Sequence, residues 1–353
     1  MVVCAPARAH AAAMRPTLAA HASSQAGLVT RRQAVEAGCT ERELRSMTAV
    51  HGPWVVVRRG VYVERALWDD LGYDGRWALR DRAAHLNLHR PHVVSHDSAA
   101  RAHALPLMRP RLPLVHITRP GVFGSRTEHG VKHHLTRRGV DDAEWAAGMP
   151  VTSLPRTALD VAREHGLEAG VVACDAALGR GVPRVALAAE LSQMRCWPDI
   201  TRARAALDHA DPGAESVGES LARLLVQELG LGRPETQFPV PNGTSTFWCD
   251  LRLGCHMIEF DGRLKYRDRA RGGVADRPIE DVLWDERQRQ RLICAHGLGM
   301  SRLVWDDFWG AARPRALARL RAEYQVTLQR FGPTLPVDLQ LYADQLRGRR
   351  RAS

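Results

Sequence analysis

The chain has 353 residues, of which 45% are hydrophobic and 25% charged, a composition typical of a globular protein with two or three domains. No stretch approaches the roughly 20 apolar residues of a membrane-spanning helix, and the seven cysteines contain no CxxC pair, so the sequence indicates neither a membrane protein nor a disulfide framework or zinc ribbon. The net charge of +11 favours phosphate-rich partners, although arginine richness can also follow from the base composition of the coding sequence. We expect a cytoplasmic protein.

The N-terminal segment is expected to be disordered over residues 1–13. The first 35 residues contain no Asp or Glu, and the alanine-rich stretch 5–22 is similar to a transit peptide. Met14 offers a second start, so we place the beginning of the first domain there. A helix is predicted from Leu18 until Gly27 breaks it.

Two capping boxes follow, at Thr30–Gln33 and Thr40–Glu43, with Gly38 between them. In a capping box the Thr and the Gln or Glu side chains satisfy each other's end amides at a helix N-terminus. Two short helices joined by a glycine-containing turn form a helix-turn-helix. The second helix is predicted from Glu41 to about Val50, and its outward residues are Arg42, Arg45 and Ser46.

The stretch 54–63 then predicts a β-hairpin with a basic tip at Arg58-Arg59-Gly60. Residues 1–66 carry nine arginines against four glutamates. A helix-turn-helix docks its second helix in the major groove of double-stranded DNA, and a basic hairpin tip suits the neighbouring backbone. We therefore predict a winged helix-turn-helix DNA-binding domain over 14–66. Its candidate DNA contacts are Arg42, Arg45, Ser46, Arg58 and Arg59. The alternative is a small helical domain that contacts proteins.

Residues 67–212 predict a mixed α/β region. Four of its histidines gather in one strand segment, namely His116, His129, His133 and His134, but their spacing fits no common zinc pattern. We therefore predict no metal there. Four helices are expected at roughly 153–165, 167–178, 183–193 and 200–210, and Asp211-Pro-Gly213 is the predicted domain boundary.

A second hairpin is predicted at 246–261, where residues alternate about Gly254-Cys255, a pair that suits a type II′ turn. Counting outward from this turn places Asp250 opposite Glu259, with Asp261 on the same face. The opposite face carries Leu251, Leu253, Ile258 and Phe260. Because opposed like charges destabilise a ladder, we expect a divalent cation, Mg²⁺ or Mn²⁺, between the carboxylates. The alternative is a solvated hairpin with an acidic edge.

Two further residues extend this candidate site. Only Lys132 and Lys265 among the 50 Lys+Arg are lysines, and lysine, unlike arginine, can lose its proton. On the predicted helix 214–229, Glu219 either reaches the metal or pairs with Arg223 at i,i+4.

The C-terminal part predicts a helix from about Pro278 to His296, which carries Arg287 and Arg289 as candidate phosphate clamps or as part of a solvated face. A strand is predicted at 300–305, followed by a helix that is interrupted at Pro314 and resumes to Phe331. We expect residues 336–353 to be a tail.

Five segments of residues 213–310 together resemble the very-short-patch-repair endonuclease-related domain, whose fold is restriction-endonuclease-like. They are Glu219–Arg223, Cys249–Leu253, Ile258–Gly262, Trp284–Arg287 and Arg302–Asp307. The resemblance implies an αβββαβ nuclease core over 213–335. In that family's usual pattern a lysine stands two residues after the metal-binding acid, where this chain has Asp261. Either Lys265 supplies the missing cation or the site is altered, and the repair enzyme's structural zinc has no evident ligand set here.

The N-terminal region, with the segments 93–100 and 151–160, resembles the abortive-infection type IV antitoxin family (AbiEi-like). Members bind operator DNA and repress their own toxin operon.

These observations lead to an α/β (α+β) fold and to two functional hypotheses. In the first, the chain is a metal-dependent DNA endonuclease of defence or repair, acting on double-stranded DNA and able to form a homodimer. Asp250 and Glu259 hold Mg²⁺, Glu219 is a third ligand through water, Lys265 stabilises developing charge, and Asp261 orients or ligates. In the second, the chain is an antitoxin-like repressor with an inactive nuclease-like domain and a cognate toxin as partner.

Overall fold

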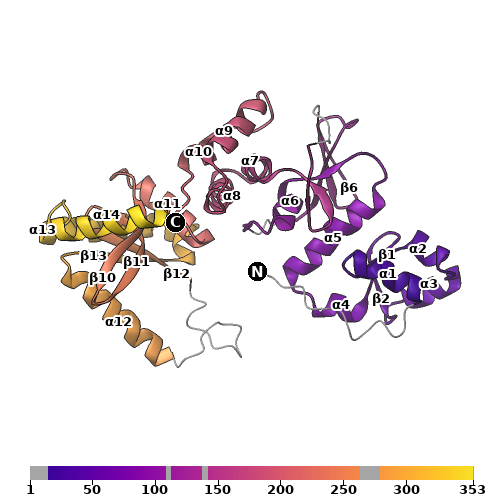
Figure 1. Cartoon of the computed structure of the whole chain (residues 1–353), viewed down its shortest axis with the longest axis horizontal. Coiled ribbons are helices and arrows are strands. Elements are labelled where there is room, and N and C mark those ends of the chain that lie inside the picture. The colour runs from indigo at the N-terminus through magenta and orange to yellow at the C-terminus, as the bar shows by residue number, and fades with distance from the viewer. Residues whose placement is uncertain (1–14, 109–112, 137–141, 263–278, 353) are drawn as a thin grey trace. The chain divides into compact units, whose positions relative to one another are not determined.

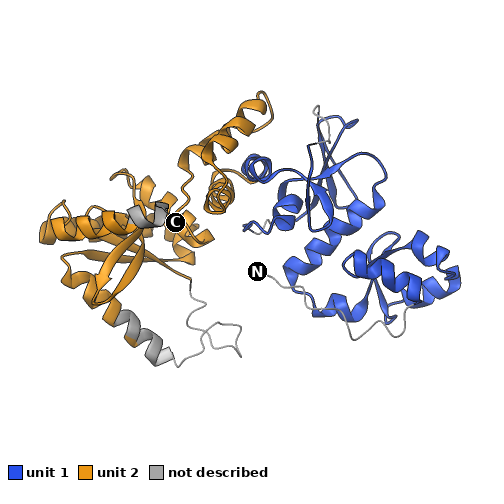
Figure 2. Ribbon diagram, viewed as in Figure 1, with its two compact units in different colours: residues 1–164 blue, residues 165–353 orange. Residues whose placement is uncertain are grey.

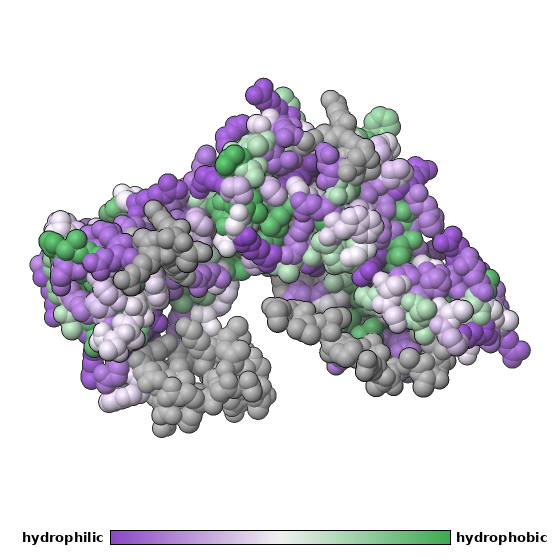
Figure 3. All heavy atoms as spheres, in the orientation of Figure 1, coloured by the Kyte–Doolittle hydropathy of each residue, from purple (hydrophilic) through white to green (hydrophobic). Residues whose placement is uncertain are grey.

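The computed structural model describes residues 15–108, 113–136, 142–262 and 279–352, and the chain divides into two compact units, 1–164 and 165–353 (Figures 1 and 2). Helices and three sheets, mixed or antiparallel, make up the described part of the chain. The prediction of a mixed α and β protein is therefore confirmed at this level. In the described residues no helix has the length and apolar character needed to cross a membrane. Figure 3 shows hydrophilic and apolar side chains interspersed over the visible face of each unit.

The first unit begins with a small helical bundle on a three-stranded antiparallel sheet of order β1-β3-β2. Its elements are α1 (Pro16–Ser24), β1 (Leu28–Thr30), α2 (Arg31–Glu36), α3 (Glu41–Met47), β2 (Trp54–Arg58) and β3 (Val61–Glu64). Both predicted capping boxes form, at the N-termini of α2 and α3. The core between helices and sheet is built on Leu18, Leu44, Trp54 and Tyr62. The α3 helix ends at Met47, three residues before its predicted end, and the Thr48 hydroxyl closes its last turn on the Leu44 carbonyl.

The rest of the first unit surrounds a six-stranded mixed sheet of order β6-β7-β5-β4-β9-β8. The strands are β4 (Val93–Val94), β5 (Val115–Arg119), β6 (Ser125–Glu128), β7 (Val131–Leu135), β8 (Glu144–Ala146) and β9 (Met149–Val151). The helices are α4 (Arg65–Asp70), α5 (Tyr73–Asn87), α6 (His96–Ala102) and α7 (Leu154–His165). Strand β5 runs parallel to β7 and antiparallel to β4, and α6 begins two residues after β4 ends.

The second unit begins with three helices, α8 (Leu167–Gly179), α9 (Arg184–Gln193) and α10 (Ile200–His209). A buried ion pair ties them to α11 (Val217–Glu228), because Arg223 Nη2 lies 2.7 Å from Asp175 Oδ2 and both side chains are 1% exposed. The hydroxyl of Ser220 also donates to Asp175, and so does the backbone N–H of Asp211. The compact units consequently divide at 164/165, and not at the 212/213 boundary expected from Asp211-Pro-Gly213.

A four-stranded sheet of order β10-β11-β12-β13 forms the centre of the second unit. Its strands are β10 (Glu235–Asn242), β11 (Ser245–Leu253), β12 (His256–Asp261) and β13 (Gly299–Val304), with α12 (Ile279–Ala295) between the last two. The first three strands are antiparallel neighbours, whereas β12 and β13 are parallel. The predicted turn between β11 and β12 forms, since Gly254 has a φ of 59° and Cys255 has no positive φ, as a type II′ turn requires.

The C-terminal helices differ from expectation in two places. After the short helix η4 (Trp305–Phe308), α13 (Ala312–Phe331) runs without interruption. Pro314 lies in its first turn, where the backbone N–H has no intrahelical partner to lose. Residues 336–353 are no tail in the structure, because 337–352 form α14 (Val337–Ala352). Its Leu339 and Ala343 are buried in the same core as Phe238 and Met257.

Candidate functional site

The carboxylates singled out from the sequence lie where β11 and β12 separate. The two strands pair at Leu253/His256, Arg252/Met257 and Leu251/Ile258, and the ladder ends there. Beyond that point β11 continues only with β10, while β12 pairs with β13. The expected backbone pair of Asp250 with Glu259 is therefore not formed. The Asp250 side chain still bridges the separation, because its Oδ2 accepts the backbone N–H of Phe260 at 2.8 Å.

The opposite side of β11 is irregular at the same position. The β10–β11 ladder passes from the pair Thr236/Leu251 to the pair Phe238/Cys249 and omits Gln237 opposite Asp250. Gln237 has a φ of 49°. This value lies in the left-handed region of backbone conformation, which residues such as Gln rarely adopt. Strained backbone of this kind tends to be kept at functional positions. Asp250 is thus flanked by interruptions of both of its ladders.

Glu219 faces this region from the first turn of α11. Its Oε1 accepts the Ser216 hydroxyl at 2.8 Å, and its Oε2 accepts the backbone N–H of Glu215 at 2.9 Å and Nε2 of Gln237 at 3.2 Å. Burial raises the pKa of the Glu219 carboxyl, and the charge of Asp250 raises it further, against the lowering effect of the Glu215 amide. The predicted alternative partner, Arg223, is instead paired with Asp175. Glu219 and Asp250 therefore interact electrostatically.

Glu259 is neutralised by an arginine of α12. Nη2 of Arg289 lies 2.5 Å from Glu259 Oε1 and also donates to the carbonyl of Trp248 at 2.7 Å. The Glu259 side chain is only 12% exposed. Burial raises the pKa of the neighbouring Cys249 thiol to about 12, and the Glu259 charge acts in the same direction. Arg289, predicted as a phosphate clamp, thus forms an ion pair with Glu259, one of the two predicted metal ligands.

Phe260 fixes the separated end of β12 against α11. A Cβ atom on Gly218 would lie 2.0 Å from Phe260 Cε1, so the helix approaches the ring as closely as only glycine permits. The ring also stacks on Phe308 and meets Trp305 edge to face. Of the remaining candidates, Asp261 lies opposite Val304 of β13. Lys265 and the Arg287 side chain lie outside the described residues.

The acidic residues are not gathered as a set of metal ligands. Among the described residues, the group of three or more His, Cys, Asp or Glu side chains whose ligand atoms all lie within 4.8 Å of one another is His96, His116 and His134. The chemistry of Asp250, Glu259 and Glu219 suits a hard cation such as Mg²⁺. Their arrangement would need Arg289 to leave Glu259 before a cation could take its place.

The candidate DNA contacts divide into two sets. Arg42, Arg45 and Ser46 are all exposed on α3, where the flanking acids are occupied, since Glu41 pairs with Arg31 and Glu43 caps the helix. At the tip of the β2–β3 hairpin Arg59 is exposed. Arg58 instead donates to the carbonyl of His129 at 3.2 Å, and its partial burial lowers the pKa of its guanidinium. The α3 set is therefore the accessible one, and Arg58 is engaged within the first unit.

No protein-family model matches this chain, and no curated protein matches it.

Sequence reasoning missed two features of the structure. The first is the Glu259–Arg289 ion pair, whose members are thirty residues apart in the chain and come from a strand and a helix. The second is His96, which joins two of the histidines noted from the sequence. Its only sequence signal is the polar run Ser95-His96-Asp97 directly after a β-branched pair.

Proposed function

We propose that the chain is a DNA-binding protein whose C-terminal part is a metal-dependent endonuclease acting on phosphodiester bonds. The observation that best supports this proposal is the position of Asp250 and Glu259 at the separation of β11 and β12, with Glu219 in electrostatic reach. Backbone irregularity on both sides of Asp250 adds to it. Half-buried carboxylates at an interrupted ladder lower the stability of the sheet, a cost that a catalytic role would explain.

The element order of the second unit agrees with a restriction-endonuclease-like core. Helix α11 precedes β10, β11 and β12, and α12 leads to β13 at the sheet edge, in the order αβββαβ that the resemblance implies. In the first unit, the order of α1 to β3 likewise supports a winged helix-turn-helix, with α3 as the recognition helix. Arg42, Arg45 and Ser46 would contact DNA, with Arg59 at the wing.

In this proposal Asp250 and Glu259 would hold Mg²⁺ or Mn²⁺, with Glu219 contributing through a water molecule. When bound, such a cation supplies an acidified water and neutralises charge on the scissile phosphate. Arg289, which pairs with Glu259 in the structure, would be available to a phosphate oxygen if Glu259 held the cation. Gly218 of α11 lets the Phe260 ring pack closely, and the Phe260 backbone N–H donates to Asp250. Lys265 would stabilise the developing charge, and Asp261 would orient the ligands.

A second candidate function is an antitoxin-like DNA-binding repressor with a non-cleaving C-terminal domain. The specific observation in its favour is the Glu259–Arg289 pair, because a guanidinium already satisfies the acid that a metal would need. In this case Arg42 and Arg45 carry the function and a cognate toxin is the expected partner.

Plasmid nicking by the purified chain with Mg²⁺ or Mn²⁺ tests the two functions. Asp250→Ala and Glu259→Ala should each abolish metal-dependent nicking while leaving a gel shift intact. Glu228→Ala is the matched control, because Glu228 lies on α11 in a surface ion pair with Arg313, where removal costs little. If the wild type shifts DNA without cutting it under either metal, the nuclease proposal fails and the repressor remains. In that case Arg42→Ala with Arg45→Ala should abolish the shift.

A further inference from the structure

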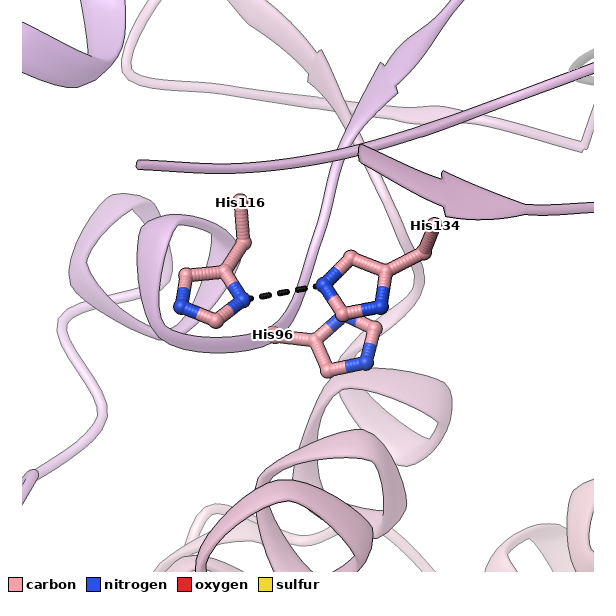
Figure 4. A group of neighbouring side chains, drawn as sticks. All are labelled: His96, His116 and His134. Carbon is pink, nitrogen blue, oxygen red and sulfur yellow. Dashed lines mark hydrogen bonds between the residues drawn. The ribbon is translucent and has the colours of Figure 1, made fainter. Parts of the chain in front are cut away.

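Three histidines meet in the first unit, away from the carboxylates discussed above. His96 is the first residue of α6, His116 belongs to β5 and His134 to β7 (Figure 4). Because β5 and β7 are parallel neighbours with Thr118 opposite His134, the His116 and His134 side chains project from the same face of the sheet. Nδ1 of His116 lies 3.0 Å from Nε2 of His134. The His96 ring stacks on the His134 ring with centroids 3.7 Å apart.

His96 and His116 are buried, His134 is half-buried, and all three imidazoles are neutral. His96 and His116 are each 2% exposed. Burial lowers the pKa of His116 to about 4 and that of His134 to about 2, with His116 contributing to the latter. Burial and the other two rings hold the pKa of His96 well below its usual value. Each ring therefore carries a lone pair on one nitrogen at neutral pH, which is the form that binds a metal.

The contact between His116 and His134 has a further requirement. Two imidazole nitrogens 3.0 Å apart repel each other if both present lone pairs, so either a proton or a cation must lie between them. His96 meets them from a backbone φ of 49°, a conformation that side chains rarely adopt. An unusual backbone conformation at His96 therefore brings a third imidazole to His116 and His134.

The surroundings supply the carboxylates that commonly orient ligating histidines. Nε2 of His116 lies 4.0 Å from Asp97 Oδ2, and Nε2 of His96 lies 3.9 Å from Asp160 Oδ1. Carboxylates beside the second ring nitrogen set the tautomer and raise the basicity of a ligating imidazole. The Ser95 hydroxyl accepts from Thr118 and lies 3.0 Å from His96 Nδ1, the nitrogen that it would yield to a bound metal.

The cations nearest to the cluster are already neutralised. Arg156 and Arg163 of α7 both bind Asp160, at 2.7 and 2.6 Å. Lys132 of β7 pairs with Glu164. Asp97 beside His116 is a third acid, so a metal ion entering the cluster would meet three acids and three basic side chains among these described residues.

We propose that His96, His116 and His134 form a binding site for a transition-metal cation, with Zn²⁺ as the best match. Zinc binds imidazole nitrogens at about 2.0–2.1 Å in tetrahedral geometry, which places ligand nitrogens about 3.4 Å apart. The three side chains already have ligand atoms within 4.8 Å of one another, and the His96 ring would have to turn out of its stack on His134 to complete the set. Three nitrogen ligands disfavour Mg²⁺, which prefers oxygen. The bound ion would join α6, β5 and β7 and leave its fourth position to water. This site is independent of the proposed nuclease.

The test uses untagged full-length protein stripped with a chelator and then titrated with Co²⁺ and Zn²⁺. We expect one equivalent of Co²⁺ with the intense visible absorption of a tetrahedral site, displaced by Zn²⁺, and a rise in the melting temperature with Zn²⁺. His116→Gln and His134→Gln should lose both responses. His85→Gln is the matched control, since His85 and His92 form a buried imidazole pair 2.9 Å apart in the same unit but without a third ring in the group.

The wild-type titration alone can overturn the proposal, so a folding defect of a variant does not protect it. If the stripped wild type takes up well under one equivalent of either metal, the cluster is a metal-free hydrogen-bonded stack. If uptake persists in both His116→Gln and His134→Gln, the metal binds elsewhere.

Discussion

The largest buried polar cluster of the first unit consists of imidazoles, whereas the buried polar groups near the central sheet of the second unit are mainly ion pairs. In the first unit, three imidazoles come into direct contact, because burial lowers their pKa values and leaves each ring neutral. In the second unit, acids are matched to arginines, as in the pairs Asp175–Arg223 and Glu259–Arg289, an arrangement that the first unit also uses at Asp160. Neutral imidazole rings can pack directly against one another, whereas carboxylates repel one another and each needs a compensating partner. This difference gives each unit its own response to mutation and pH.

The largest expected effect comes from breaking a charge pair in the second unit. Asp175→Ala would leave Arg223 buried without its carboxylate, which costs about 3–5 kcal/mol of unfolding free energy. Urea unfolding should show this loss, while Glu228→Ala, in an exposed pair, should change stability by less than about 1 kcal/mol. Equal effects from the two substitutions would contradict the distinction between buried and surface pairs.

The next effect is a loss of stability on acidification, centred on the first unit. The folded pKa values of His116 (about 4) and His134 (about 2) lie below the ordinary value of 6.5. The unfolded chain therefore binds more protons as the pH falls below 6.5. Each histidine should remove up to about 1.4 kcal/mol per pH unit between pH 6.5 and its folded pKa, with no loss above pH 6.5.

The measurement is the urea midpoint of the chelated protein at pH 7.5, 6.0 and 5.0. His85 and His256, whose pKa values burial also lowers to about 4, contribute in the same direction. The informative quantity is therefore the difference between the wild type and His116→Gln, which should show a shallower pH dependence. Identical slopes would mean that His116 is not buried neutral.

A smaller effect tests whether packing fixes the carboxylate region. Gly218→Ala places a methyl group 2.0 Å from the Phe260 ring and should cost about 1–3 kcal/mol by overpacking. Gly179→Ala, where the nearest atom beyond the helix is 3.5 Å away, should be neutral. If nicking is observed, Gly218→Ala should lower it, because Phe260 also donates to Asp250. A Gly218→Ala protein as stable as Gly179→Ala would show that the ring moves aside freely.

Local chemistry was predictable from the sequence, and long-range pairing was not. Capping boxes at Thr30 and Thr40 and the turn at Gly254 formed as expected, because each depends on residues within a few positions of one another. The separation of β11 and β12 depends instead on β13, a parallel partner that arrives only after a long connection. The predicted hairpin extended the pairing of the two strands to Asp250 and Glu259, one pair beyond the point where it ends.

The same limit applies to the domain boundary and to the histidine cluster. Asp211-Pro-Gly213 has the composition of a linker, yet the buried pair of Asp175 and Arg223, 48 residues apart, joins the chain on both sides of it. His96 is brought to His116 and His134 by sheet order and by a rare backbone conformation. Neither the domain boundary nor the histidine cluster can be predicted from the spacing of residues in the sequence.

The helix α14 has a practical consequence for anyone dividing this protein. Its Leu339 and Ala343 cover Phe238, Val240 and Met257 of the central sheet. A fragment ending at Pro336 would turn this interior into an open apolar surface, and such surfaces promote aggregation. Loss of soluble yield from that fragment would report that this face of the sheet is uncovered, whatever the state of the carboxylates.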